Sequence, residues 1–249
     1  MGESELIKKA LEFMREEQKQ GNQHVKNLQN KFSLRHYLRI AQEIKYSLPG
    51  KAKILDWGCG YGAMTFFLSK LGVNVIPSDV HCASSVFLSE MGIGNLIRID
   101  SVDLPFKDES LEAVLSCGVL EHVAHPEESL NELNRVITKQ GWLFIYMLPY
   151  KYGLYEFIAS ILKKSDHPVK YTFQSIKRTL KKHGFEIIGF KRGNLFPKNL
   201  VFMPLFILKF MENLYNEHCD SCIFIEKILL RIPVLNLLSG TLEIKARKI

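Results

Sequence analysis

The sequence predicts an α/β fold in which a mainly parallel β-sheet is covered by helices on both faces. Short apolar runs, typical of buried strands, alternate with segments whose apolar residues recur at helical spacing. The chain has 249 residues, 47% hydrophobic and 24% charged, a composition that supports one domain with a substantial core. Because crossovers between parallel strands are right-handed, the connecting helices are expected on both sides of the sheet.

The first fifty residues are predicted to be helical. Residues 1–20 are highly charged, and we expect them to form a solvated helical arm. Residues 33–48 carry apolar side chains at helical spacing, and Pro49-Gly50 ends this second helix.

From residue 53 to residue 148, predicted strands and helices alternate. The strands are 53–57, 73–79, 95–99, 111–117 and 141–148, and the helices are 61–71, 82–91 and 127–138. This alternation is typical of βαβ units that build a parallel sheet.

The pattern loosens after Pro149. We predict helices at 153–163 and 172–183, and strands at 185–192 and 240–249. The two strands are separated by a long apolar stretch, 193–239. The whole chain, 1–249, is therefore interpreted as a single domain with an N-terminal helical arm (1–48), a core (50–150) and an apolar helical insertion (193–239).

Charge and cysteine content narrow the class of protein. The net charge is +7, but the basic residues are dispersed, which favours a solvated basic face over a nucleic-acid-binding arm. The five cysteines are odd in number and irregularly spaced, and no export signal precedes them, so we expect reduced thiols and a cytoplasmic location. Cys219 and Cys222 form a CxxC pair without a second ligand pair, so no metal site is predicted.

The stretch "KILDWGCGYGAMTFFL" at 53–68 leads from the first strand through three glycines into a helix. Glycines at the carboxyl end of a first strand allow a sharp turn and a close approach of a ligand to the backbone. The pattern is G-x-G-x-G, an imperfect match to the dinucleotide fingerprint G-x-G-x-x-G. Asp56 at the strand tip would repel a pyrophosphate and suits a ligand with positive charge.

Other polar residues end the neighbouring strands. Asp79 ends the second strand, where an acid can accept both hydroxyls of a ribose. Asp100 follows the third strand, and Cys117 ends the fourth. Because these strand ends meet at one edge of the sheet, a nucleoside with a cationic end would fit there.

Four segments in this order resemble a class I S-adenosylmethionine-dependent methyltransferase of the broad bacterial small-molecule group. They are "ILDWGCGYG", Asp79, "DSVDLPFKDESLEAVLSCGVLEHVAHPEESLNELNRVITKQGWLFI" and "GFEIIGF". The resemblance covers residues 50–150 strongly and 165–192 weakly. It implies a Rossmann-like sheet of seven strands, the last antiparallel, with the insertion placed before the last strand.

The resemblance also implies a cofactor, S-adenosyl-L-methionine, and the residues that bind it. Asp56, Gly58 and Gly60 would border its methionine part, Asp79 would bind the ribose, and Cys117 would lie under the sulfonium. The complete set of expected cofactor-binding residues is Asp56, Gly58, Cys59, Gly60, Asp79, Val80, Asp100, Ser101 and Cys117. Asp103 precedes Leu104-Pro105 and is interpreted as a turn residue.

Methyl transfer to oxygen requires that the acceptor lose a proton. His122, beside Glu121 just after the fourth strand, is the first candidate for the base, with a helix-start or packing role as the alternative. His167 is the second candidate, and capping a helix is its alternative role. Gly118 stands where some related O-methyltransferases carry a metal-binding Glu, so no metal dependence is predicted.

The insertion has three open interpretations: extra core helices, a wall for an apolar acceptor, or an interfacial surface. Its apolar runs are too short to span a bilayer. The last two interpretations suggest a small or lipid-like acceptor and a peripheral membrane contact or a homodimer through 198–238. The sequence therefore predicts methyl transfer to such an acceptor at oxygen. The alternatives are a methyltransferase acting on RNA or protein, which the missing "DPPY/NPPY" motif disfavours, and a catalytically silent module that retains the cofactor fold.

Overall fold

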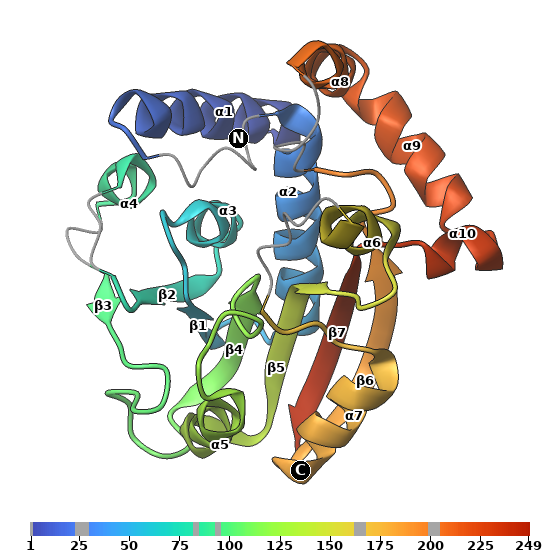
Figure 1. Ribbon diagram of the computed structural model, residues 1–249. Helices are drawn as coiled ribbons and strands as arrows, with labels where there is room; N and C mark the ends of the chain where they lie inside the picture. The colour runs from blue at the N-terminus through green and yellow to red at the C-terminus, as the bar shows by residue number, and fades with distance from the viewer. Residues whose placement is uncertain (1, 23–29, 82–84, 93–95, 162–167, 199–204) are drawn as a thin grey trace.

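The computed structural model describes residues 2–22, 30–81, 85–92, 96–161, 168–198 and 205–249. Its centre is a seven-stranded sheet with the order β3-β2-β1-β4-β5-β7-β6 (Figure 1). The strands are β1 (Lys53–Trp57), β2 (Asn74–Asp79), β3 (Ile97–Arg98), β4 (Leu111–Cys117), β5 (Ile137–Pro149), β6 (Phe185–Gly193) and β7 (Thr241–Lys248). Strands β1 to β5 pair in parallel, and β7 runs antiparallel to both β5 and β6. The predicted fold class, including the antiparallel last strand, is confirmed.

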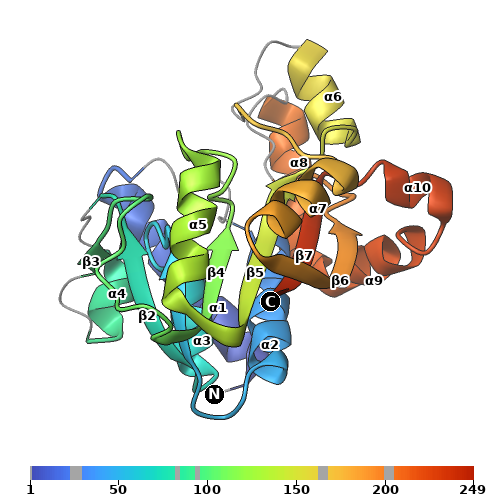
Figure 2. The same ribbon diagram turned by 90° about the horizontal axis from the view of Figure 1, so that it is seen from below.

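Helices cover both faces of the sheet (Figure 2). One face packs against α1 (Glu3–Lys19), α2 (Lys31–Ser47), α3 (Ala63–Lys70) and α4 (Val86–Glu90). The other face packs against α5 (Pro126–Val136) and α7 (Phe173–Lys182). Alternate strand residues serve the two layers: Ala113 and Leu115 belong to the first core, and Val114 belongs to the second.

The expectation of a solvated N-terminal arm is wrong. Helix α1 buries one face, which includes Leu6, Ala10 and Met14, and the ring of Phe13 lies edge-on to Phe66 and Phe87. These apolar positions recur every three or four residues and form a stripe that α2 and α4 cover. Most of the charged side chains of 1–20 therefore lie on the outer face of the helix, whereas Glu17 is buried and accepts the Val86 amide at 2.6 Å.

The stretch between β6 and β7 contains three helices, α8 (Leu205–Glu217), α9 (Cys219–Leu229) and α10 (Pro233–Leu237). They follow one another along the outer edge of the molecule, beyond β6 (Figure 1). A small separate core joins α8 and α9 to α2, with Phe32 stacked on Tyr215 at 4.4 Å between ring centroids and the buried Cys219 and Cys222 beside them. These cysteines thus have a packing role.

Element boundaries differ from the predicted ones in a few places. Residues 137 and 138 are expected from the sequence to end a helix. In the structure α5 ends at Val136, and these two residues begin the 13-residue strand β5. Strand β3 has only two residues. The helix α6 (Leu154–Ile161) lies within the predicted 153–163, of which 162 and 163 are outside the described residues.

Candidate functional site

The glycines of the loop between β1 and α3 adopt positive φ angles and have different surroundings. The amides of Gly58 and Cys59 both donate to the Ser78 carbonyl at 2.9 Å, which ties the loop to β2. Gly58 has φ +75°, and a Cβ there would lie 2.6 Å from the Val119 side chain. Gly60 has φ +54°, and no atom lies within 4 Å of where its Cβ would be. The first glycine is thus required by packing and conformation, and the second exposes backbone to open space.

Asp56 lies beneath this loop. It is buried, and the Thr65 hydroxyl of α3 donates to its carboxylate at 2.6 Å. Burial raises the pKa of Asp56 to about 6, and the nearby Asp79 adds to this effect. The structure therefore shows this carboxylate bonded to the first turns of α3.

Asp79 lies beside the loop at the end of β2. One of its carboxylate oxygens accepts the Gly60 amide at 2.8 Å, and the other accepts the His81 amide at 3.0 Å. The glycine loop and the acid are thus in direct contact, as the convergence of strand ends predicts. The next residue, Val80, is exposed.

The remaining expected cofactor residues lie around this edge. Asp100 is exposed, and its carboxylate accepts the Val102 amide at 3.1 Å, whereas Ser101 is half-buried. Cys59 is half-buried with its thiol near the Gly60 carbonyl, and Cys117 lies at the tip of β4. Burial raises the pKa of both thiols, so neither is a thiolate at neutral pH.

A cavity of about 270 Å³ opens beside the ends of β4 and β5. Its lining includes Cys117, Gly118 and His122 on the β4 side and Met147 at the end of β5. The opposite wall comes from far along the sequence and contains Asn194, Phe196, Pro197 and Lys198. This cavity is the candidate acceptor site, because it touches the residue expected beneath the methyl group.

His122 lies at the rim of this cavity. Its side chain is 49% exposed, and its Nε2 atom lies 4.0 Å from Oε1 of the buried Glu121. The imidazole thus lies at the cavity rim with a buried carboxylate nearby. His167, the second candidate, lies outside the described residues.

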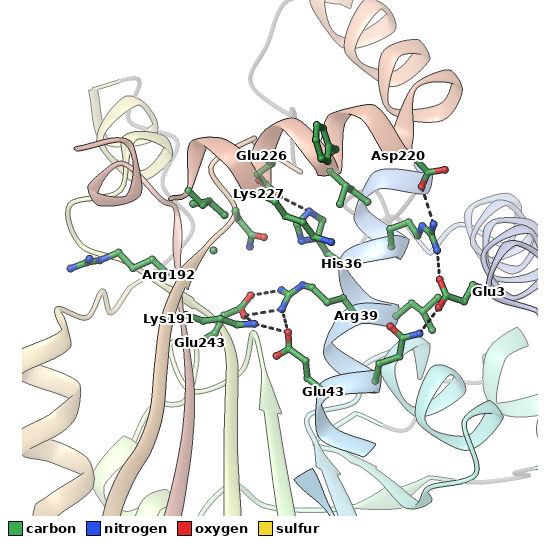
Figure 3. A pocket seen from close by; sticks show the side chains of 18 residues that line it. Glu3, His36, Arg39, Glu43, Lys191, Arg192, Asp220, Glu226, Lys227 and Glu243 are labelled. Carbon is green, nitrogen blue, oxygen red and sulfur yellow. Dashed lines mark hydrogen bonds and ion pairs between the residues drawn. The ribbon is translucent and has the colours of Figure 1, made fainter. Parts of the chain in front are cut away.

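A larger cavity of about 830 Å³ lies between α2, α9 and the edge formed by β6 and β7 (Figure 3). Most of its charged lining is paired internally, whereas Arg192 and Lys227 make no ion pair with the residues that the structure describes. Arg39 contacts Glu243 at 2.5 Å and Glu43 at 2.7 Å, Lys191 contacts both acids, and His36 contacts Glu226 at 3.0 Å. Because these groups neutralise one another, we assign this cavity a structural role.

Comparisons with known proteins agree with the geometry. Residues 55–145 match the family model described as "Methyltransferase domain". A Mycobacterium tuberculosis protein named "Uncharacterized methyltransferase" is 30% identical over 146 residues, which cover 51% of this chain and 56% of that protein. Residues 55–145 are therefore similar to a methyltransferase domain, and the curated relatives that they match carry methyltransferase names.

The methyltransferase domain also has relatives with other names. A bovine protein, "Probable tRNA methyltransferase 9B", is 30% identical over 112 residues, which cover 44% of this chain and 24% of that protein. The chain spans about half the length of the mycobacterial relative and less of the bovine one.

Two solved structures share the fold. One is a SAM-dependent methyltransferase from Archaeoglobus fulgidus, with a TM-score of 0.54, 18% identity, and coverage of 85% of this chain and 92% of that one. The other is the Burkholderia thailandensis 1,6-didemethyltoxoflavin-N1-methyltransferase, solved with S-adenosylhomocysteine. It has a TM-score of 0.52, 16% identity, and coverage of 85% of this chain and 78% of that one.

The residues present fit S-adenosylmethionine, the cofactor of this family. The backbone at Gly60 faces open space, and the Asp79 carboxylate beside it supplies hydrogen-bond acceptors for hydroxyl groups. No group of three or more His, Cys, Asp or Glu side chains within the described ranges is arranged to hold a metal. The glycine loop is thus the candidate donor side of the site, and the 270 Å³ cavity is the candidate acceptor side.

Sequence reasoning did not find several residues of the acceptor side. Tyr37 of α2, Asn194 and Lys198 all line the cavity. None of them lies in a motif, and each reaches the cavity only through packing of distant elements. The one available indication was the position of Lys198 at the start of the apolar insertion.

Proposed function

We propose that this protein transfers the methyl group of S-adenosylmethionine to an oxygen of a small or lipid-linked acceptor bound in the 270 Å³ cavity. The observation that supports this most is the position of the cavity, which includes Cys117 at the end of β4, the strand that pairs with β1 ahead of the glycine loop. A volume near the lower end of the range for ligand pockets suits a small reacting group.

The chain would position the acceptor against the cofactor. The cofactor carries a methyl group on a sulfonium, which leaves as a neutral thioether and needs little help. The cavity residues would hold the acceptor within about 3–3.5 Å of the reacting carbon. Tyr155, Phe196 and Pro149 provide aromatic and aliphatic walls. His122, half-exposed at the rim, is the base suggested by the sequence.

A labelling experiment tests the proposal. The protein is incubated with methyl-tritiated S-adenosylmethionine and, separately, a polar metabolite extract, a lipid extract and bulk tRNA, and label is counted in each product fraction. We expect label in the metabolite or lipid fraction, in a base-stable ether or an alkali-labile ester. Label confined to tRNA would favour the activity in the name of the bovine relative and overturn the acceptor assignment.

The inserted helices support a contact with a membrane surface. Eleven of the sixteen large apolar side chains that are exposed in the described structure lie on α6 or between α8 and the end of α10. They are Leu154, Phe157, Ile161, Phe206, Phe210, Phe224, Ile225, Ile228, Ile232, Val234 and Leu237. None of the described helices has the length and apolar character that a bilayer crossing requires. The contact would therefore be peripheral.

Charge indicates which surface these helices would meet. On α9, Phe224, Ile225 and Ile228 are exposed, whereas Cys222 and Glu226 face inward. Lys227 and Arg231 share the exposed side, and the only acid between residues 221 and 238 is the buried Glu226. The exposed acids of the inserted helices, Glu212, Glu217 and Asp220, precede this stretch, so the apolar face at 224–237 with its cations is complementary to an anionic lipid surface. A cytoplasmic location is part of the same proposal, and the free thiols Cys59 and Cys117 agree with it.

Vesicle sedimentation tests the contact. We expect binding to phosphatidylcholine vesicles that contain phosphatidylglycerol, and little binding to pure phosphatidylcholine. Phe224→Ser with Ile228→Ser should abolish it, whereas Tyr46→Ser, at an exposed aromatic residue of α2, should not. If light scattering instead shows a dimer that the double variant dissociates, with no vesicle binding, the surface is a homodimer interface and the lipid proposal fails.

A further inference from the structure

Lys198 brings an amine into the acceptor cavity from a segment far from the family motifs. It follows β6 and lines the wall opposite Cys117 and His122. Its Nζ atom lies 3.3 Å from Sδ of Met147. The same sulfur accepts a hydrogen bond from the side-chain amide of Asn194 at 3.3 Å. Met147 has φ +60° at a break in the β5 register between Ile145 and Leu148. The thioether of Met147, at the irregular end of β5, thus contacts the amine of Lys198.

The inserted helices fix the segment that carries Lys198. The Tyr215 hydroxyl of α8 donates to the Pro197 carbonyl at 3.0 Å. The buried Glu226 of α9 accepts the Phe196 amide at 2.9 Å. Because both residues immediately before Lys198 are anchored, the insertion sets the position of the amine in the cavity.

Glu121, His122 and Glu156 line the same cavity as Lys198, and further titratable groups near it come from four elements. Arg39 and His36 lie on α2, Glu226 on α9, Glu243 on β7 and Cys117 on β4. Both carboxylates have closer partners, since Glu243 pairs with Arg39 at 2.5 Å and Glu226 pairs with His36 at 3.0 Å (Figure 3). Within the described ranges, Lys198 itself makes no ion pair.

This environment disfavours the ammonium form of Lys198. Burial lowers its pKa to about 7, and Arg39 adds to the effect, while Glu243, Glu226 and Cys117 oppose it. A large fraction of the amine is therefore neutral near physiological pH. A base whose pKa lies near the working pH is suited to general base catalysis.

We propose that the neutral ε-amine of Lys198 accepts the hydroxyl proton of the acceptor, and that the acceptor carries a phenol- or enol-type hydroxyl on a small apolar body. This inference rests on the proposed function. The acceptor oxygen uses an electron pair to bond the methyl carbon, the carbon–sulfur pair stays with the sulfur, and the hydroxyl proton passes to Lys198 as ammonium. One O–H and one C–S bond break, and one O–C and one N–H bond form.

The chemistry of the cavity favours this acceptor class. A phenol has a pKa of about 10, close enough to that of Lys198 for proton transfer, whereas water and alkyl alcohols lie nearer to about 16. The walls offer aromatic and apolar contacts from Tyr37, Tyr155 and Phe196. Lys198 is also more enclosed than His122, whose side chain is 49% exposed.

The first test measures the amine without any acceptor. The intact protein is pulse-labelled with acetic anhydride across a pH series, with free N-acetyl-lysine amide as internal standard, and modification of Lys198 is followed by mass spectrometry. We expect the reactivity of Lys198 to rise with pH, with a midpoint near pH 7. A midpoint equal to that of the standard would overturn the assignment.

The second test uses phenol and catechol as acceptor probes. For the wild type we expect kcat/KM to rise with pH along an ascending limb whose midpoint lies near pH 7. Lys198→Met should lower kcat at least about 100-fold and remove this limb, while the Kd for S-adenosylhomocysteine stays within about threefold. Lys198→Arg keeps a positive charge but cannot accept a proton, so it should be equally slow. His122→Gln should retain the limb.

Three results would contradict the inference. They are a limb that survives in Lys198→Met and disappears in His122→Gln, full activity in Lys198→Arg, or no methylation of any probe by a protein that labels metabolites. If no fraction is labelled at all, the proposed function has failed, and the acetylation midpoint still decides whether the amine is neutral. Thermal melting of each variant confirms folding.

Discussion

Replacing Asp79 with alanine should weaken cofactor binding far more than replacing Asp103. The Asp79 carboxylate touches the glycine loop through the Gly60 amide at 2.8 Å and the His81 amide at 3.0 Å, and it is expected to bind the cofactor ribose. Asp103 is an exposed acid in the turn after β3, three residues beyond Asp100. The two substitutions remove the same chemical group from two neighbouring strand ends.

The expected size follows from the bonds that are lost. Hydrogen bonds that involve a charged partner contribute about 1.5–3 kcal/mol, and each 1.4 kcal/mol is about a factor of ten in Kd. Asp79→Ala should therefore raise the Kd for S-adenosylhomocysteine by about 10- to 150-fold. Asp103→Ala should change it by less than about twofold.

Isothermal titration calorimetry with S-adenosylhomocysteine measures both values directly. Thermal melting without ligand shows whether Asp79→Ala has also loosened the loop, because it leaves the Gly60 and His81 amides without their carboxylate partner. Equal dissociation constants for the two folded variants would refute the assignment of Asp79 to the ribose.

Three further predictions concern the scaffold. Gly58→Ala should lower the melting temperature more than Gly60→Ala: both glycines have positive φ, but only at Gly58 would a Cβ lie 2.6 Å from a neighbouring side chain. Asp56→Asn should gain stability relative to the wild type as pH rises, by up to about 3 kcal/mol between pH 4 and pH 8 in urea unfolding. The sign follows because the folded-state pKa of Asp56 is raised to about 6, so its protonated form stabilises the fold below the unfolded pKa and this contribution is lost above 6; a pH-independent difference would contradict it. Arg39→Met should cost less than the about 3–5 kcal/mol of a fully unpaired buried acid, because it removes the nearest partner of the buried Glu243 but leaves Lys191 at 3.3 Å, and adding Glu243→Leu should recover most of that loss.

Much of the donor side could be predicted from the sequence, because it depends on local signals. The strand 53–57, the glycines behind it and the acid at the end of β2 are close in sequence, and parallel strands bring their carboxyl ends together. The contact between Asp79 and Gly60 follows from that topology. Its role in binding the cofactor stays a prediction, as do the roles of His122 and His167.

The acceptor side could not be predicted in the same way. The buried ion pair between Arg39 and Glu243 joins residues 204 positions apart, and the anchors of the Lys198 segment are Tyr215 and Glu226 on inserted helices. No periodicity or motif encodes such pairings, because they depend on how complete elements pack.

By itself, then, the sequence determined the order of strands and helices along the chain, the fold class and the candidate donor edge of the sheet. The spacing of apolar residues and the turn residues involve only a few neighbouring positions. The order of elements and the fold class can therefore be predicted from local sequence. Only the tertiary structure decided which elements cover the apolar face of α1 and that the insertion presents one apolar face outward. It also decided that the amine of Lys198 enters a cavity formed by β4 and β5. Burial and proton affinity depend on the neighbours that folding brings together, so neither is a property of the residue alone.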